Sequence, residues 1–295
     1  MRHPLLRIHR LEYPFPIHYL CYAVWGLFYA PGNLTQLLKL PVLLVFLANL
    51  IHPMAMNALN CAADTRTDAR NPRKRDLAQA ATRIGVGRVA AIALAELVLC
   101  FGLCAVAAVL LHRPLVAVTM AAIVALHLLY NLEPIHLKRR GLFNPIALGA
   151  SFGFLPCILS HSVVTPLFAG PTWLIYSGLG LSVTARSLWW MVPDRAADAA
   201  STTTTAAVRY GAARMARLSC GIALAVPLAL SWGLWLAYSP FWGILGAALA
   251  AGWFGGQLTS LRTISLRSYA DLRRRSMTPM MVANVAFAVV PLVAR

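Results

Sequence analysis

Nine long apolar runs, separated by short polar segments, account for most of the sequence. They cover residues 17–30, 40–56, 86–111, 115–130, 145–169, 173–192, 216–236, 241–258 and 279–294. Several are shorter than the ~20 residues that a helix needs to cross the hydrocarbon core of a bilayer, so we expect them to extend into flanking residues. Hydrophobic residues make up 59% of the chain and charged residues only 12%, a balance that excludes a pair of soluble domains and a disordered chain. The sequence therefore predicts one all-α domain over residues 1–295, a polytopic membrane bundle of about nine transmembrane helices.

Basic residues are concentrated in every second segment between these runs. The chain has 26 Lys and Arg residues against 9 Asp and Glu residues, a formal net charge of +17. All the Lys and Arg residues except Lys39, Arg113 and Arg295 lie before the first run or in and beside the loops that follow the even-numbered runs. Arg186 is counted beside the loop that follows the sixth run. Because cytoplasmic loops of membrane proteins collect Lys and Arg, we expect a multi-pass protein of the cell membrane with a cytoplasmic N-terminus and an outside C-terminus. The same pattern explains the positive charge without a nucleic-acid partner.

Several polar or reactive side chains lie inside the apolar runs. The six cysteines show no zinc-ligand spacing and are expected to be apolar filling residues. Glu96 lies within the third run, where an acid is either functional or paired inside the bundle, with His127 or a backbone carbonyl as the partner. His52 and His127 match no metal motif, so we expect them to be structural.

Four of the nine acids form two pairs with the same spacing. Asp64 and Asp68 follow the second run, Asp194 and Asp198 follow the sixth, and Asn60 extends the first pair by one turn. Residues four apart share a helix face, where two carboxylates repel each other unless a cation lies between them. Carboxylate oxygens suit Mg²⁺, which also takes waters and substrate phosphates as ligands. A single pair would be interpreted as solvated loop charge, but two pairs at equivalent ends favour a metal site.

Basic residues flank both acidic pairs. Those near the first pair are Arg66, Arg70, Arg73, Lys74 and Arg75, and those near the second are Arg195 and Arg209. Carboxylates, Mg²⁺ and basic side chains together would form a clamp that stabilises the negative charge of a leaving diphosphate. We expect this clamp to open to the cytoplasm.

Three segments, in this order, resemble the UbiA superfamily of intramembrane prenyltransferases. Residues 60–68 are similar to the NxxxDxxxD motif of that family. Residues 130–138 resemble its Tyr…Pro…Lys segment, and Asp194 and Asp198, followed by Gly211, match its second DxxxD motif. The resemblance covers nearly the whole chain. It departs from the family at Cys61, where many relatives carry an acid, and at residues 190–193, where the family often has polar residues before the second motif.

The resemblance implies a helical bundle around a central cavity, with Mg²⁺ and diphosphate bound at a cytoplasmic cap formed by residues of about 60–85, 131–144, 193–215 and 259–278. The implied Mg²⁺ ligands are Asn60, Asp64 and Asp68 for one ion and Asp194 and Asp198 for another. Arg75 and Lys138 would bind phosphate oxygens, Tyr130 would lie beside the reacting carbon, and the isoprenyl tail would occupy an apolar tunnel open to lipid.

Three functions are candidates for a chain with these features. The first, which we favour, is a prenyltransferase that ionises a geranyl, farnesyl or geranylgeranyl diphosphate and transfers the prenyl group to an apolar aromatic or quinone-like acceptor. The second is a UbiA-type terpene cyclase, in which the alkenes of the tail quench the cation. The third, a transporter or structural membrane protein, would leave both acidic pairs unexplained. Trp189 and Trp190 would support cyclisation if their rings stabilised a cation, although an aromatic belt at the membrane interface is the preferred interpretation.

Overall fold

The structure is a computed structural model that describes residues 3–32, 34–72, 74–192, 194–200, 204–260 and 268–294, with the side chains of residues 34, 197 and 256–278 left aside. The regular secondary structure of these residues is helical, apart from one isolated bridge between Gly141 and Thr205. The long helices are α2 (Phe15–Tyr29), α3 (Leu40–Arg70), α5 (Val86–Leu111), α6 (Pro114–Asn131), α9 (Gly170–Met191), α12 (Ala212–Ala237), α13 (Pro240–Ser260) and α14 (Ser268–Val293). One further span is built from α7 (Phe143–Gly149), a π-helical turn η3 (Ala150–Phe154) and α8 (Leu155–Val164). The short elements are α1 (Pro4–Ile8), α4 (Arg75–Ile84), α10 (Arg195–Ala200), α11 (Ala206–Tyr210) and the 3₁₀ turns η1 (Leu34–Leu38) and η2 (Leu137–Arg139).

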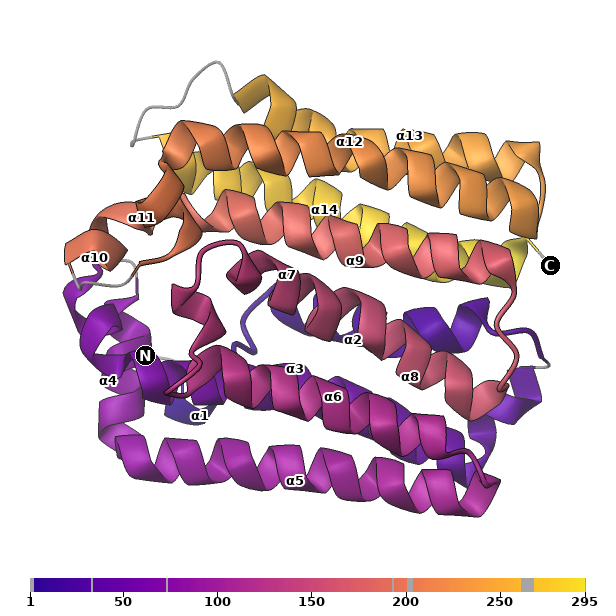
Figure 1. Cartoon of the computed structure of the whole chain (residues 1–295), viewed down its shortest axis with the longest axis horizontal. Coiled ribbons are helices and arrows are strands. Elements are labelled where there is room, and N and C mark those ends of the chain that lie inside the picture. Colours follow the sequence, from indigo (N-terminus) through magenta and orange to yellow (C-terminus); the bar gives the residue numbers. More distant parts are fainter. Residues whose placement is uncertain are drawn as a thin grey trace.

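The long helices run side by side along one direction, and the short helices gather at one end (Figure 1). The helices α1, α4, α10 and α11 lie at the left of the view together with the N-terminus, whereas the C-terminus lies at the right. Three of the four predicted cap segments meet at this left end, and the fourth, residues 259–278, falls partly outside the described residues. The polar parts of the chain therefore collect at one end of an apolar bundle.

Each of the nine apolar runs coincides with a helix or with the α7–η3–α8 segment. Within the described residues, five of these helical segments have the length and hydropathy needed to cross a membrane: Leu40–Arg70, Val86–Leu111, Pro114–Asn131, Phe143–Val164 and Ala212–Ala237. The predicted number of nine spans is not confirmed by this criterion. Outward-facing side chains such as Val98, Val109 and Leu228 are more than 70% exposed, as expected for helices whose apolar faces contact lipid.

The first long helix packs against the last one and so closes the bundle. The indole Nε1 of Trp25 in α2 donates to the carbonyl of Asn284 in α14 at 3.1 Å, and the Tyr29 hydroxyl donates to the Phe287 carbonyl at 2.8 Å. On another face of α2, Gly26 contacts α8 so closely that a Cβ atom there would lie 2.1 Å from the Cys157 carbonyl oxygen. These contacts hold α2 between two helices that are remote in sequence.

The buried polar side chains pair differently from the sequence-based expectation. Glu96 contacts His9 Nε2 at 2.9 Å, so its partner is in the N-terminal segment. His127 instead contacts His52, with 3.1 Å between His127 Nε2 and His52 Nδ1. The suggested Glu96–His127 pair is therefore wrong, because the N-terminal segment returns to cover α5 and supplies a closer base. The six cysteines are buried and free, as expected for filling residues.

Candidate active site

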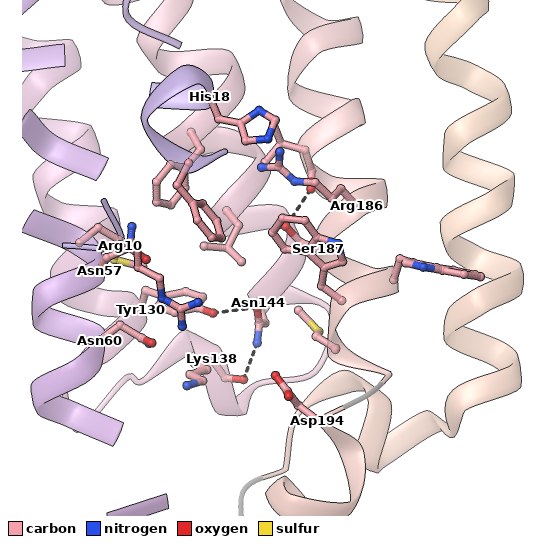
Figure 2. A pocket seen from close by; sticks show the side chains of 18 of the residues that line it. Arg10, His18, Asn57, Asn60, Tyr130, Lys138, Asn144, Arg186, Ser187 and Asp194 are labelled. Carbon is pink, nitrogen blue, oxygen red and sulfur yellow. Dashed lines mark hydrogen bonds between the residues drawn. The ribbon is translucent and has the colours of Figure 1, made fainter. Parts of the chain in front are cut away.

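A cavity of about 690 Å³ opens among α2, α3, α6, α9 and the loops at the polar end of the bundle (Figure 2). Its volume lies in the usual range for small-molecule sites. Apolar and aromatic walls come from Tyr22, Met56, Leu148, Phe152 and Val183. Phe152 belongs to the π-helical turn, a distortion that occurs frequently at functional sites.

The first polar stripe lies on one continuous helix. Helix α3 runs past the predicted end of its apolar run at residue 56 to Arg70, and so carries Asn60, Asp64 and Asp68 on successive turns. Asn60 lines the cavity and donates to Asn131 Oδ1 at 3.1 Å. Asp64 and Asp68 are 7% and 4% exposed and lie just behind the cavity wall. The predicted stripe is therefore present, with its two acids buried.

Two lysines stand between these acids and the cavity. Lys138, the second residue of η2, forms an ion pair with Asp64. Lys74, in the turn before α4, places its Nζ atom 2.8 Å from Asp194 Oδ2 and 3.8 Å from Asp68 Oδ1. A single ammonium group therefore joins the two acidic motifs. Burial lowers the pKa of Lys138, but the Asp64 carboxylate beside it outweighs burial, so the pKa is raised and the lysine is charged.

The second acidic pair approaches the same cavity from the end of α9. Asp194 lies in the turn after α9, with its Oδ1 atom 3.4 Å from Asn71 Nδ2, and Asp198 lies in α10. Asp198 accepts a hydrogen bond of 3.1 Å from the Thr205 hydroxyl. Burial raises the pKa of the Asp198 carboxyl, and the positive charge of Lys74 partly opposes this effect. The structure thus brings both predicted acidic pairs to one end of one cavity.

Tyr130 lies at the end of α6, inside the cavity wall. Its hydroxyl donates to Asn144 Oδ1 at 3.1 Å, and Asn144 Nδ2 donates to the Lys138 carbonyl at 3.0 Å (Figure 2). This chain of hydrogen bonds fixes the Tyr130 ring relative to the segment that carries Lys138. Asn144 was not singled out in the sequence.

Arg75, a predicted site residue, lies away from this cavity. Helix α4 buries Leu77, Ala78 and Ala81 against the bundle, which leaves Arg75 exposed on its outer face. There Arg75 lines a separate shallow hollow. The preceding residue, Lys74, takes the inward position instead.

Four further cavity residues were assigned wrongly or not identified from the sequence. Trp189 is only 2% exposed and, like Trp190, lines the cavity, so the aromatic-belt interpretation is wrong for this pair. Arg186 is not a loop charge, because it is buried within α9 and also lines the cavity. Arg10, in the turn after α1, lines the cavity with its guanidinium 5.8 Å from the centre of the Phe15 ring. Only the tryptophans gave a sequence signal, through their position beside the second motif.

The oxygen ligands of the site suit Mg²⁺. Among the described residues, no three His, Cys, Asp or Glu side chains are grouped closely enough to hold a metal on their own. Mg²⁺ does not require such a group, since it usually binds one or two carboxylates together with waters and substrate phosphates. Asp64 and Asp68 are four residues apart on α3, and the Asp198 carboxylate faces the same end, so the donor set fits this ion.

The fold is an apolar helical bundle with paired acids and lysines at one end of an apolar cavity. The sequence matches the profile of the UbiA prenyltransferase family over residues 19–292. The chain therefore belongs to the UbiA prenyltransferase family, as its motifs predicted.

Solved structures share this fold. The structure of a UbiA homologue from Archaeoglobus fulgidus bound to GPP and Mg²⁺ has a TM-score of 0.71 at 14% identity, with 99% of each chain covered. The apo structure of a UbiA homologue from Aeropyrum pernix K1 has a TM-score of 0.71 at 17% identity, covering 96% of this chain and 99% of that one. A digeranylgeranylglyceryl phosphate synthase structure has a TM-score of 0.64 at 14% identity, covering 97% and 98%. The comparison with curated proteins gives no match.

Proposed function

We propose that this protein is a Mg²⁺-dependent intramembrane prenyltransferase that ionises an isoprenyl diphosphate and transfers the prenyl group to an apolar aromatic or quinone-like acceptor. The observation that carries the proposal is the meeting of two acidic motifs and two lysines at one end of an apolar cavity. Membership of the UbiA family supports it, as do the relatives bound to GPP or DMAPP together with Mg²⁺.

The diphosphate binds at the lysine end of the cavity. Lys138 and Lys74 donate to its oxygens, and Asn60 lines the same end with an amide. Asp64 and Asp68, with Asn60, would hold one Mg²⁺, and Asp194 and Asp198 would hold a second. With the ions bound, the site would gain positive charge to offset the negative charge of the leaving diphosphate. In this account the lysines exchange their carboxylate partners for phosphate oxygens when the substrate arrives.

The reaction breaks the bond between C1 of the isoprenyl chain and the bridging oxygen, and the electron pair leaves with the diphosphate. Tyr130 lies beside this carbon, where its ring faces the allylic cation and its hydroxyl is held by Asn144. A π-electron pair of the acceptor forms the new bond to C1, and the acceptor then loses a proton to water or to the released diphosphate. The products are the prenylated acceptor, diphosphate and one proton.

The alternative is a terpene cyclase, and one observation favours it. Trp189, Trp190 and Tyr22 line the cavity, and aromatic faces stabilise cations. In that reaction the alkenes of the tail, rather than an acceptor, supply the electron pair.

The orientation of the protein in the membrane is part of the proposal. The excess of Lys and Arg on one set of loops supports a cytoplasmic N-terminus and active-site cap and an outside C-terminus. The water-soluble diphosphate would then leave on the cytoplasmic side.

Product analysis separates these reactions. The purified protein is incubated with Mg²⁺ and geranyl, farnesyl or geranylgeranyl diphosphate, with and without a panel of aromatic and quinone-like acceptors, and extracts are analysed by mass spectrometry. We expect prenylated acceptor and released diphosphate only in the tubes with acceptor, and neither with an Asp64→Ala variant. A cyclic hydrocarbon or terpene alcohol without acceptor would favour the cyclase, and intact diphosphate in every tube would contradict both.

A further inference from the structure

Exposed arginines gather where α3, α4 and α5 follow one another at the polar end of the bundle. Residues 60–88 contain six arginines and one lysine but only three acids. Two of the acids, Asp64 and Asp68, are buried beside lysines. The third, Asp76, forms an ion pair of 3.0 Å with Arg7 of α1. The arginines of this segment whose side chains the structure describes are all exposed: Arg66, Arg70, Arg75, Arg83 and Arg88. The surface of this segment is therefore strongly positive.

Two of these arginines line one shallow hollow on the outer face of α4. Its volume is about 240 Å³, and its lining residues are Ala69, Arg75, Ala78, Gln79, Thr82 and Arg83. This volume lies below the ~300–1,000 Å³ that is usual for small-molecule cavities. The hollow therefore suits one polar head group, with methyl groups from the alanines and an amide from Gln79 beside the two guanidinium groups.

The charge of the hollow favours an anion. Two guanidinium groups that line the same small hollow repel each other, and a negative group between them removes this repulsion. The planar fork of a guanidinium matches the oxygens of a phosphate with two parallel hydrogen bonds. Arg75 and Arg83 together therefore suit a phosphate group.

The helix that follows the hollow indicates what this phosphate is attached to. Helix α5 begins at Val86, three residues after Arg83. Val86, Leu94 and Val98 are 39%, 42% and 71% exposed, and their spacing puts them on one side of α5. Figure 1 shows α4 at the left edge of the bundle and α5 along its lower edge, so the two helices meet at the perimeter. An anionic head with an apolar tail matches both surfaces, whereas a soluble polyanion would leave the apolar side unused.

The place of the hollow in the chain supports the same ligand. Helices α3 and α5, on either side of α4, both have the length and hydropathy needed to cross a membrane. Basic clusters beside the end of a membrane-spanning helix, and basic pockets between two such helices, bind the head groups of anionic lipids. Residues 66–88 fit this description.

We propose that the hollow lined by Arg75 and Arg83 binds the phosphate of an anionic phospholipid whose acyl chains lie along α5. The two arginines hold the phosphate, Gln79 donates to a head-group oxygen, and the exposed side of α5 around Val98 contacts the chains. This inference goes beyond the proposed function and does not depend on it, because the hollow and the active-site cavity share no lining residue.

Two lipids with the same chains and different head-group charge test the inference. Native mass spectrometry of the purified full-length protein in detergent measures its affinities for dioleoyl phosphatidylglycerol and dioleoyl phosphatidylcholine. We expect the wild type to bind phosphatidylglycerol about tenfold more tightly or better, as expected for two arginines near a membrane surface. The double variant Arg75→Gln, Arg83→Gln should lose this preference while it binds phosphatidylcholine as the wild type does. The double variant Arg75→Lys, Arg83→Lys should keep part of the preference.

A second pair of arginines gives the matched control. Arg214 and Arg217 are exposed on α12, which begins at the same end of the bundle (Figure 1). The double variant Arg214→Gln, Arg217→Gln removes the same charge and should keep the full preference. An equal loss in both glutamine variants would show that overall charge, rather than the hollow, attracts the lipid, and would overturn the inference.

Competition distinguishes a lipid from a free phosphate compound. A large excess of glycerol 3-phosphate should not displace the bound phosphatidylglycerol, because it has no acyl chains to contact α5. Complete displacement would assign the hollow to a soluble phosphate and would overturn the lipid assignment. Equal affinities of the wild type for the two lipids, or a preference that survives in Arg75→Gln, Arg83→Gln, would also overturn it.

Discussion

Lys74 connects the two halves of the proposed diphosphate site. Its ammonium group contacts Asp194 from the segment after α9 and Asp68 from α3, which are more than a hundred residues apart in sequence. A charge shared between two carboxylates holds the two motifs at a fixed separation before any substrate binds. The same ammonium group is positioned to donate to a phosphate oxygen.

Lys74 lines the cavity and its neighbour Arg75 does not, and this difference can be tested by mutation. Lys74→Met removes a cation from the cavity wall, so we expect kcat/KM for the isoprenyl diphosphate to fall by about tenfold or more, as for the loss of a charge-assisted hydrogen bond worth ~1.5–3 kcal/mol. Arg75→Met should change kcat/KM by less than about twofold, because that side chain points away from the cavity. Steady-state kinetics of both variants measure this, and equal losses would show that the inward position of Lys74 has no special role.

Tyr130 gives a second prediction at this scale. Tyr130→Phe keeps the ring but removes the hydrogen bond to Asn144, which is worth about 1 kcal/mol. If this bond orients the ring only in the reacting complex, kcat should fall about fivefold while KM for the diphosphate stays unchanged. A larger KM with unchanged kcat would place Tyr130 in substrate binding rather than beside the reacting carbon.

The sequence predicted the acidic stripes but not the lysine geometry. Spacing of four residues is enough to put Asp64 and Asp68 on one helix face. Which of Lys74 and Arg75 faces inward depends on the turn after α3 and on the buried face of α4, and neither follows from residue type. The position of Arg186 in the cavity wall was missed for a related reason, because a basic residue near the end of an apolar run is usually interpreted as a loop charge.

At the scale of elements, the close contact between helices α2 and α8 depends on a glycine. Gly26 of α2 lies against the α8 backbone, where a Cβ would be 2.1 Å from the Cys157 carbonyl oxygen. Gly102, on α5, has no atom within 4 Å of the position of its Cβ. The two glycines are both helical and therefore form a matched pair.

Alanine at each position tests this packing. Gly26→Ala should lower the free energy of unfolding by about 1–3 kcal/mol, as expected for overpacking, whereas Gly102→Ala should be neutral or slightly stabilising because alanine favours the helix. Thermal unfolding in detergent measures both. A Gly26→Ala protein as stable as the wild type would contradict the close α2–α8 contact.

A second element-scale prediction concerns the attachment of the N-terminal segment to α5. Burial lowers the pKa of His9, but its hydrogen bond to Glu96 and to the Leu5 carbonyl outweighs burial and raises the pKa. A raised histidine pKa means that this contact stabilises the fold fully below about pH 6.5, the ordinary value, and that the contribution is lost as the pH rises through the folded pKa. The stability difference between wild type and Glu96→Gln should therefore be larger at pH 6 than at pH 9. A difference that does not change with pH would show that His9 is uncharged in the contact.

At the scale of the whole molecule, polar and apolar regions are separated along the bundle axis. The short helices and both acidic motifs lie at one end (Figure 1), and apolar side chains cover the outer faces of α5 and α12. Hydropathy alone located the nine helical segments of this arrangement. Hydropathy did not predict that α2 packs against α14. That contact depends on hydrogen bonds from the Trp25 and Tyr29 side chains to the α14 backbone, which join the two ends of the sequence.

The central claim is that the acids and lysines at this end bind an isoprenyl diphosphate together with Mg²⁺. The most direct test is the affinity of the purified protein for geranyl thiolodiphosphate, which resists ionisation, titrated with Mg²⁺ or with EDTA. We expect tight binding in Mg²⁺ that falls at least tenfold in EDTA and in an Asp68→Asn, Asp198→Asn double variant. Binding of equal strength with and without Mg²⁺, or in the double variant, would contradict it.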